Sequence, residues 1–542
     1  MFELPSALPL PVNEPVLDYA PGSRERAQLK ARLASMSAER AELTHIIDGK
    51  EHGAGERFEV RMPHRHAHVL GTAPRGGATE ARLAIDAARK ASAEWSRAPF
   101  ETRARVFLRA AELAAGPYRA TLNAATMLGQ SKTAYQAEID AACELIDFLR
   151  FNVAYATRLL EQPLSAPGVR NVVEARPLEG FVLAITPFNF TAIAANLPSV
   201  AALLGNVVVW KPSESQALAA HYTMRMFQEA GLPAGVINLV HGDGAQVADA
   251  CLAEPDFAGL HFTGSTDVFR AISRKVAEKL ADYKNFPRLV GETGGKDFVL
   301  AHASADAEAL AVALVRGAYE FQGQKCSAAS RAYVPRSLWP DVKARVLEEI
   351  AAIKQGDVSD FRMFMGAVIH ERSYDKLHDW KTRLEADAGA RVYGGDRWSK
   401  REGYFAGPTL CELEDPNHPL MHTELFGPVL GVHVYDDARW EEICRELDAT
   451  SPYALTGAIF ASDRQAIAQA ARWLRNAAGN LYINDKPTGA VVAQQPFGGG
   501  RASGTNDKAG SVLNLLRWIS PRVVKETFVP ARVVGYPSMA EE

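Results

Sequence analysis

The chain has 542 residues, of which 47% are hydrophobic and 23% are charged, and its formal net charge is −4. This length exceeds what one hydrophobic core ordinarily serves, so we expect about two to four domains. The nearly balanced charge offers no broad basic field, which argues against a protein that binds nucleic acid or anionic lipid. The five cysteines lie far apart without metal-ligand spacing, so a disulfide framework and a structural zinc site are not expected.

The thiols and the amino terminus indicate the compartment. Sparse cysteines fit a reducing environment. Residues 1–20 lack both the charged start of a secretory signal and the arginine-rich pattern of a transit peptide. We therefore expect a cytoplasmic protein.

One uncharged stretch, residues 180–210, is long enough to cross a bilayer. Pro187 and Pro198 interrupt it, however, and it contains asparagines that would need polar partners inside a membrane. A strand, a turn, a buried helix and a second strand are the better interpretation, so no membrane association is expected.

Helical periodicity dominates the first part of the chain, and alternating strands and helices follow. Helices are predicted at about 24–43, 80–96, 100–115 and 134–161. The next strands are predicted at 181–185, 207–210, 236–240 and 259–262, with helices at about 191–204, 214–230, 245–253 and 267–283. Apolar strands separated by helices are typical of a parallel sheet covered on both faces, which indicates an α/β domain of the nucleotide-binding type.

A second α/β series begins after Gly291. Strands are predicted at 297–301, 331–335, 428–435, 456–460 and 480–484, with helices at about 304–322, 336–354, 371–387, 438–447 and 463–477. There is no internal repeat, low-complexity tract or flexible linker. We therefore expect two tightly packed domains with a cleft between them.

Polar residues at two strand ends indicate a nucleotide site. Lys211 and Glu214 follow the strand at 207–210, where open α/β sheets bind ligands, and they suit the hydroxyls of an adenosine ribose. Gly264 and Ser265 precede the next helix, whose free N–H groups favour phosphate. Each turn alone is equally compatible with an ordinary helix cap, and "HGDGAQ" lacks the third glycine of the dinucleotide fingerprint. Together the two strand ends favour a cofactor.

Cys326 differs from the other cysteines in its surroundings, because Gly323 opens the bend before it and small residues follow. An isolated cysteine is more often an inert small hydrophobe. Here a substrate can approach, the Cys326 N–H can meet an oxyanion, and Lys325 is expected to lower the thiol pKa. Glu292, in "GETGG", ends a strand among uncharged neighbours. A raised pKa there suits a general base, although an exposed turn glutamate is the alternative.

A series of short motifs follows in order along the chain: "TPFNF" (186–190), "WKPSE" (210–214), "FTGST" (262–266), "GETGGK" (291–296), "GQKCS" (323–327), "ELFGPV" (424–429) and "QQPFGGGRASGTND" (494–507). From about residue 45 onward the chain resembles the aldehyde dehydrogenase superfamily. More narrowly, the segments 136–152, 285–299, 321–335 and 476–510 are similar to the Δ1-pyrroline-5-carboxylate dehydrogenases, the L-glutamate γ-semialdehyde dehydrogenases of proline catabolism.

This resemblance implies NAD-dependent oxidation of L-glutamate γ-semialdehyde to L-glutamate through a cysteine thiohemiacetal and thioester, with no metal. It implies that Cys326 is the nucleophile, that Glu292 is the base for water, and that Asn189 and the Cys326 N–H form the oxyanion hole. The implied NAD contacts are Lys211, Glu214, Ser265, Glu424 and Phe426. The implied substrate contacts are Glu144 for the ammonium, Ser327, Gly489 and Ala490 for the carboxylate, and Phe190 and Phe497 for the aliphatic chain.

The implied fold is α/β and aldehyde dehydrogenase-like: a Rossmann-type NAD-binding domain, an α/β catalytic domain and a small β oligomerisation flap. The expected divisions are an N-terminal arm with the first part of the NAD-binding domain (1–156), an oligomerisation hairpin (157–179), the NAD-binding domain (180–293), the catalytic domain (294–500), and a C-terminal return with an oligomerisation segment (501–542). The segments 157–179 and 522–534 would leave sheet edges exposed in a monomer, so we expect a homodimer or a higher homo-oligomer.

Two departures and three alternatives accompany the resemblance. Phe269 lies where most aldehyde dehydrogenases have a glycine, which agrees with the narrower family, and Ala490 lies where that family often has serine. The alternatives are a dehydrogenase for another semialdehyde such as succinate semialdehyde, a CoA-acylating relative, and a non-catalytic scaffold. Glu292 argues against acylation of CoA, which needs no hydrolytic base, and the presence of Cys326, Glu292 and Asn189 argues against a scaffold.

Overall fold

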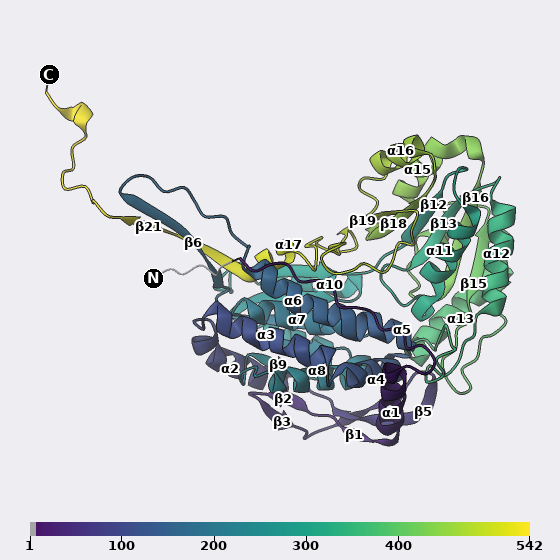
Figure 1. The fold of residues 1–542 in the computed structure, drawn as a ribbon, viewed down its shortest axis with the longest axis horizontal. Coiled ribbons are helices and arrows are strands. Elements are labelled where there is room, and N and C mark those ends of the chain that lie inside the picture. The colour runs from purple at the N-terminus through teal and green to yellow at the C-terminus, as the bar shows by residue number, and fades with distance from the viewer. Residues whose placement is uncertain (1–6, 542) are drawn as a thin grey trace.

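The computed structural model describes residues 7–541, whose strands form two seven-stranded sheets and three smaller ones. Figure 1 shows the two large sheets side by side, with a two-stranded ribbon projecting from the body. The expected α/β fold with two large sheets is thus confirmed. No helix in the described part of the chain is both long and apolar enough to cross a membrane. The stretch 180–210 folds as strand, buried helix and strand, as expected.

The first large sheet has the strand order β11-β10-β7-β8-β9-β2-β3. Its parallel strands are β7 (Phe181–Thr186), β8 (Val207–Pro212), β9 (Ile237–Leu239), β10 (Phe257–Thr263) and β11 (Arg288–Glu292), and its antiparallel edge is β2 (His45–Ile47) and β3 (Lys50–His52). Numbered by their order in the chain, the parallel strands lie across the sheet in the order 3-2-1-4-5, the dinucleotide-binding order. The switch point, where ligands bind, therefore lies between β7 and β10.

Helices cover this sheet in two groups. One group includes α7 (Thr191–Leu203) and α8 (Ala217–Glu229), behind which lie α3 (Phe100–Ala115), α4 (Arg119–Gln130) and α6 (Leu145–Ala156). The other group contains α2 (Ala78–Trp95), α9 (Gly244–Leu252) and α10 (Thr266–Glu278). Right-handed crossovers between parallel strands place such groups on opposite faces.

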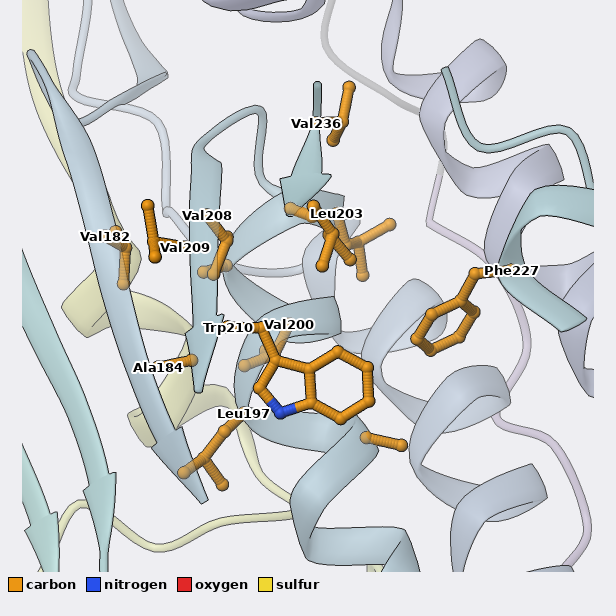
Figure 2. Packing of buried hydrophobic residues seen from close by; sticks show 14 of the residues in the cluster. Val182, Ala184, Leu197, Val200, Leu203, Val208, Val209, Trp210, Phe227 and Val236 are labelled. Atoms are coloured by element: carbon orange, nitrogen blue, oxygen red, sulfur yellow. The ribbon is translucent and has the colours of Figure 1, made fainter. Parts of the chain in front are cut away.

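Trp210 is the largest side chain of the core between β8 and its helices. Figure 2 shows its indole beside Leu197 and Val200 of α7, with Phe227 of α8 beyond it. The buried indole N–H donates a hydrogen bond to the Thr186 hydroxyl (3.0 Å), which joins the ends of β8 and β7. The loops that follow these two strands therefore begin at one edge of the sheet.

The second large sheet has the order β14-β15-β16-β13-β12-β18-β19, parallel except for β14. Its strands are β12 (Asp297–Ala301), β13 (Ala329–Pro335), β14 (Ala390–Gly394), β15 (Thr409–Leu413), β16 (Val429–Tyr435), β18 (Thr456–Phe460) and β19 (Asn480–Ile483). Its helices are α11 (Ala307–Tyr319), α12 (Trp339–Ala352), α13 (Glu371–Ala386), α14 (Pro419–His422), α15 (Trp440–Thr450) and α16 (Arg464–Trp473).

The short segment 293–296 joins the two sheets, since β11 ends at Glu292 and β12 begins at Asp297. The carboxyl edge of the first sheet is thereby brought to the amino edge of the second. The division expected at 293/294 falls within this segment.

The N-terminal region differs from the helical prediction. The helix expected at 24–43 is α1 (Arg24–Ala38), and the three-stranded sheet β1-β5-β4 that follows was not predicted: β1 (Ala41–Glu42), β4 (Arg57–Met62) and β5 (Arg65–Pro74). In β4 buried and exposed residues alternate, which is the period-2 pattern of a half-buried strand. The helix expected at 134–161 consists of α5 (Ala134–Ala137), the π-helix η1 (Glu138–Glu144) and α6.

The projecting ribbon pairs β6 (Val169–Pro177) with β21 (Ile519–Thr527) in antiparallel register. Residues 157–179 thus supply one strand and do not form the expected hairpin. Pro163 and Pro167 precede β6 and lack the N–H groups that a second strand would donate. The partner strand comes instead from the C-terminal segment, which continues past the ribbon in Figure 1.

Candidate active site

Cys326 lies between α11 and β13, after a bend of left-handed backbone. Phe321, Gln322 and Gly323 have φ values of 51°, 55° and 64°, a conformation that costs energy for residues with side chains. A Cβ on Gly323 would lie 2.5 Å from the Gly427 carbonyl oxygen, so glycine is required there. The Gln322 amide holds the bend through hydrogen bonds to the backbone of Ser131, Gly366 and Ala367.

Asn189 belongs to the loop between β7 and α7 and is buried. Its Nδ2 donates a hydrogen bond of 3.0 Å to the carbonyl oxygen of Gln324, two residues before Cys326. The structure therefore brings the carboxyl end of β7 to the bend that precedes Cys326. A side-chain amide in this place can donate to an oxyanion beside the sulfur.

The last two glycines of "GETGG", Gly294 and Gly295, are explained by close packing on both sides of the segment. A Cβ on Gly295 would overlap the carbonyl oxygen of Cys326, and a Cβ on Gly294 would overlap the Glu424 carboxylate. The Gly295 N–H donates a 2.8 Å hydrogen bond to Glu424. The segment after Glu292 therefore lies between Cys326 and Glu424 and brings three of the predicted site residues together.

Burial raises the pKa of the Glu292 carboxyl well above its usual value, and the charge of Asp507 adds to the increase. The ammonium of Lys508 opposes both. Lys508 also donates hydrogen bonds to the carbonyl oxygens of Gly479 and Gly498, each at 2.8 Å. The raised pKa expected for Glu292 agrees with this environment, whereas Lys508 was not identified from the sequence because it lies far from residue 292 along the chain.

The pKa expected for Cys326 was wrong in direction. Burial raises the pKa of the thiol well above its usual value, and the carboxylates of Asp297, Glu292 and Glu424 raise it further. Lys325, expected to lower it, forms an ion pair with Glu320 (3.1 Å). A lysine beside a cysteine in sequence can point away from it, and here its charge is neutralised by another partner.

The predicted adenosine and phosphate contacts lie at the carboxyl edge of the first sheet. Lys211 is buried at the end of β8, and Ser265 caps the N-terminus of α10 by accepting from the Val268 N–H. Glu214 pairs with Arg75 at 2.9 Å, a partner that the sequence did not indicate. A lysine, a carboxylate and a helix N-terminus near the switch point fit an adenosine diphosphate group.

The predicted nicotinamide contacts lie close to the nucleophile. Glu424 is held by Gly295, and Phe426 has a left-handed φ of 58°. The Phe426 ring packs edge-on against Phe188 of the "TPFNF" loop, with 5.8 Å between centroids. These residues fit the nicotinamide end of NAD. Residues 7–541 contain no group of His, Cys, Asp or Glu side chains arranged to hold a metal ion.

Only some of the residues predicted to bind the substrate lie next to one another in the structure. The Ser327 and Thr488 hydroxyls are hydrogen-bonded at 2.8 Å, so Ser327 adjoins the loop that contains Gly489 and Ala490. Thr488 was missed, because its partner is distant in sequence. Phe497 exchanges backbone hydrogen bonds with Ala509 on a separate turn.

Glu144 and Phe190 lie on a neighbouring part of the site. Glu144 ends η1, where burial and the nearby Asp140 raise its pKa well above the usual value and the ammonium of Lys132 opposes the increase. The same ammonium lies 4.0 Å from the centroid of the Phe190 ring. No hydrogen bond or ion pair within residues 7–541 joins Glu144 to the loop at 488–490.

Comparisons with known proteins agree along the whole chain. A model described as "Aldehyde dehydrogenase family" matches residues 50–523. The "Delta-1-pyrroline-5-carboxylate dehydrogenase, mitochondrial" of Dictyostelium discoideum is 48% identical over 538 residues, covering 98% of this chain and 96% of that protein. The human protein of the same name is 45% identical over 529 residues, covering 97% and 94%. The crystal structure of Delta-pyrroline-5-carboxylate dehydrogenase from Mycobacterium tuberculosis bound with NAD is 53% identical and covers 100% of both chains, with a TM-score of 0.96.

These names contradict the cytoplasmic location expected from the sequence. The relatives from Dictyostelium discoideum, Danio rerio, Mus musculus and Homo sapiens are named mitochondrial proteins. All five cysteines are free, and free thiols fit any reducing compartment, so they do not distinguish the cytoplasm from mitochondria. Since the family model spans residues 50–523 and these relatives match nearly the whole chain, the protein belongs to the aldehyde dehydrogenase family.

Proposed function

We propose that this enzyme oxidises L-glutamate γ-semialdehyde, which is in equilibrium with Δ1-pyrroline-5-carboxylate, to L-glutamate with NAD in proline catabolism. The names of its relatives support this substrate. The observation that carries the chemistry is the hydrogen bond from Asn189 to the Gln324 carbonyl, because it sets an oxyanion donor beside Cys326. Residues 180–293 bind NAD in this proposal, and residues 294–500 supply the nucleophile.

The Cys326 thiol releases its proton to solvent as the sulfur adds to the aldehyde carbon, and the Asn189 amide and the Cys326 N–H stabilise the resulting oxyanion. A bound NAD would supply the acceptor for the hydride that this carbon loses as the thioester forms on the Cys326 sulfur. Glu292 then takes a proton from water as the water oxygen adds to the thioester carbon. The C–S bond breaks, the thiol is regenerated, and L-glutamate leaves.

Substrate selectivity is assigned to the recognition of two oppositely charged groups of the substrate, its α-carboxylate and its ammonium. The N–H groups of Gly489 and Ala490 and the Ser327 hydroxyl hold the α-carboxylate, and Glu144 accepts from the ammonium. Phe190 and Phe497 flank the aliphatic chain. Leaving a charged group unpaired in a closed site costs several kcal/mol, so analogues that lack either charge are poor substrates.

A panel of aldehydes tests the proposal. We expect kcat/KM for glutamate semialdehyde to exceed that for succinate semialdehyde and for propanal by about 100-fold or more. Cys326→Ala should abolish NADH formation while retaining NAD affinity, and Cys251→Ala, a buried cysteine of α9, should leave turnover unchanged. Comparable oxidation of propanal by the unaltered enzyme would contradict the substrate assignment but leave the family unaffected.

We propose in addition that the ribbon of β6 and β21 joins two copies of the chain. An isolated two-stranded ribbon is marginally stable in water, and its free edges invite pairing. Exposed apolar residues continue along it and beyond: Leu164, Val523, Phe528, Val529, Val533 and Val534. Removal of residues 522–542, which takes away most of β21, should shift the mass measured by light scattering toward that of the monomer, and an unchanged mass would contradict the assignment.

A further inference from the structure

Lys132 follows α4 and is fully buried, although the reaction as proposed makes no use of it. Its ammonium forms an ion pair with Asp140 at 2.7 Å, and the Asp140 side chain is also fully buried. Burying two charges is costly unless each has close partners. The contacts of the Lys132–Asp140 pair therefore indicate which role it has in the protein.

Asp140 caps a helix that belongs to another part of the chain. Its two carboxylate oxygens accept hydrogen bonds from the N–H groups of Thr191 (3.0 Å) and Ala192 (2.9 Å), which begin α7. The residue at the N-cap position, Phe190, has no side-chain oxygen to do this. A carboxylate at a helix N-terminus is stabilised by the free N–H groups and the helix dipole. Asp140 thereby fixes the start of α7, directly after Asn189 and Phe190.

The Lys132 ammonium contacts two aromatic rings as well. It lies 4.0 Å from the ring centroid of Phe190 and 4.5 Å from that of Phe321, within the range of a cation–π interaction. Phe190 follows Asn189, and Phe321 begins the left-handed bend that leads to Cys326. A single buried charge thus contacts both loops that carry the reacting groups.

The element that supplies Asp140 is itself irregular. Asp140 lies in the π-helix η1, whose wider turn interrupts the α-helical course between α5 and α6. Such turns recur at functional sites because they redirect side chains that a regular helix would place elsewhere. Here the redirected carboxylate reaches both Lys132 and α7.

We infer that Lys132, together with Asp140, is a positioning residue that holds the Asn189 loop and the Cys326 bend in register for hydride transfer. This inference rests on the oxyanion role proposed for Asn189. A small displacement of reacting groups lowers a rate strongly, whereas a pair that served stability alone would leave the chemical step of the folded enzyme unaltered.

Single-turnover kinetics with full-length enzyme test the inference. Lys132→Met should lower the rate of NADH formation in the first turnover by about tenfold or more, with the affinity for NADH changed by less than about twofold. Because Lys132 acts partly through Asn189, its effect should be smaller when measured in an Asn189→Ala background. Equal effects in both backgrounds, or an unchanged first turnover in Lys132→Met, would overturn the inference.

Lys343 offers a matched control far from the site. Lys343, on α12, pairs with Glu412 at 2.9 Å and lies 4.1 Å from the Tyr393 ring centroid, so it combines an ion pair with an aromatic contact in a partly exposed place. Lys343→Met should leave the first turnover unchanged. A comparable loss in this variant would show a general effect on the fold and overturn the positioning role.

Two further outcomes separate the inference from the function on which it rests. If Asn189→Ala itself forms NADH at the normal rate, the oxyanion role fails and the inference fails with it. If Asn189→Ala is slow while Lys132→Met is not, only the inference fails.

Should Lys132→Met not fold, Phe321→Leu removes one ring and leaves the ion pair intact. A slower first turnover in that variant supports the inference, and an unchanged one overturns it.

Discussion

A Cβ atom on residue 295 would overlap the backbone carbonyl oxygen of Cys326, so the nucleophile and the segment after Glu292 are in contact through their main chains. The same segment holds Glu424 on its other side through the Gly295 N–H. The positions of Cys326, Glu292 and Glu424 are therefore interdependent.

Gly295→Ala should lower kcat by about 100-fold or more, because the new methyl group must push the Cys326 backbone away from its place. Gly294→Ala meets the Glu424 side chain instead and should chiefly raise KM for NAD. Gly53→Ala, at an exposed site where a Cβ makes only ordinary contacts, is the control. Steady-state kinetics distinguish the three variants, and equal effects of Gly294→Ala and Gly295→Ala would contradict the separate contacts.

Glu292→Gln should impair hydrolysis of the thioester more than hydride transfer, since an amide keeps the volume of the side chain but cannot accept a proton. Rapid mixing should show at most one equivalent of NADH per site in a burst, followed by slow turnover. Loss of the burst would mean that Glu292 acts before the thioester forms.

The acid limb of the rate profile should depend on Lys508. Glu292 accepts a proton only as a carboxylate, so hydrolysis rises as pH increases through its raised pKa and is lost as pH falls below it. Lys508→Met removes the ammonium that lowers this pKa, so the limb should move to higher pH. Lys508→Arg retains the charge and should leave the limb in place. A shift to lower pH in Lys508→Met would contradict the assignment.

Glu214→Gln should increase the use of NADP. In the folded chain Glu214 pairs with Arg75, so the substitution removes a carboxylate that repels a 2′-phosphate and frees a guanidinium that attracts one. We expect the ratio of kcat/KM for NAD to that for NADP to fall by about tenfold or more. Glu56→Gln removes the other carboxylate partner of Arg75 and should change the ratio little. An equal change in both variants would place the 2′ position away from Glu214.

Asn13→Ala should lower kcat/KM for glutamate semialdehyde selectively. The Asn13 amide donates to the Val492 carbonyl (2.9 Å) and to Asp147 (2.8 Å), so it joins the loop after Ala490 to the helix after Glu144. Loss of such hydrogen bonds should lower kcat/KM for glutamate semialdehyde by about tenfold. Propanal, which carries neither charge, is the control substrate. A parallel loss for both aldehydes would indicate a general effect and contradict a role in selectivity.

Local pattern sufficed for the central strands of the two large sheets and for proposing several candidate site residues. The apolar runs of β7, β8, β10, β12 and β18 alternate with helices, and this periodicity is a property of short segments. Cys326, Glu292, Lys211 and Ser265 were identifiable because turn glycines or strand ends lie beside them in the chain. A candidate residue whose role depends on its neighbours in the sequence can be proposed without knowing the fold.

Contacts between distant segments were decided by the tertiary structure alone. Lys325 adjoins Cys326 in sequence, yet its charge is held by Glu320, and the thiol pKa is raised by burial and by Asp297, Glu292 and Glu424. Lys132 contacts Phe190 of the Asn189 loop directly and is joined to the start of α7 through Asp140, and β6 pairs with β21 from the other end of the chain. A charged side chain interacts with any group that the fold places near it, and a strand edge pairs with any strand that the fold places beside it. The partners of both therefore cannot be derived from spacing along the chain.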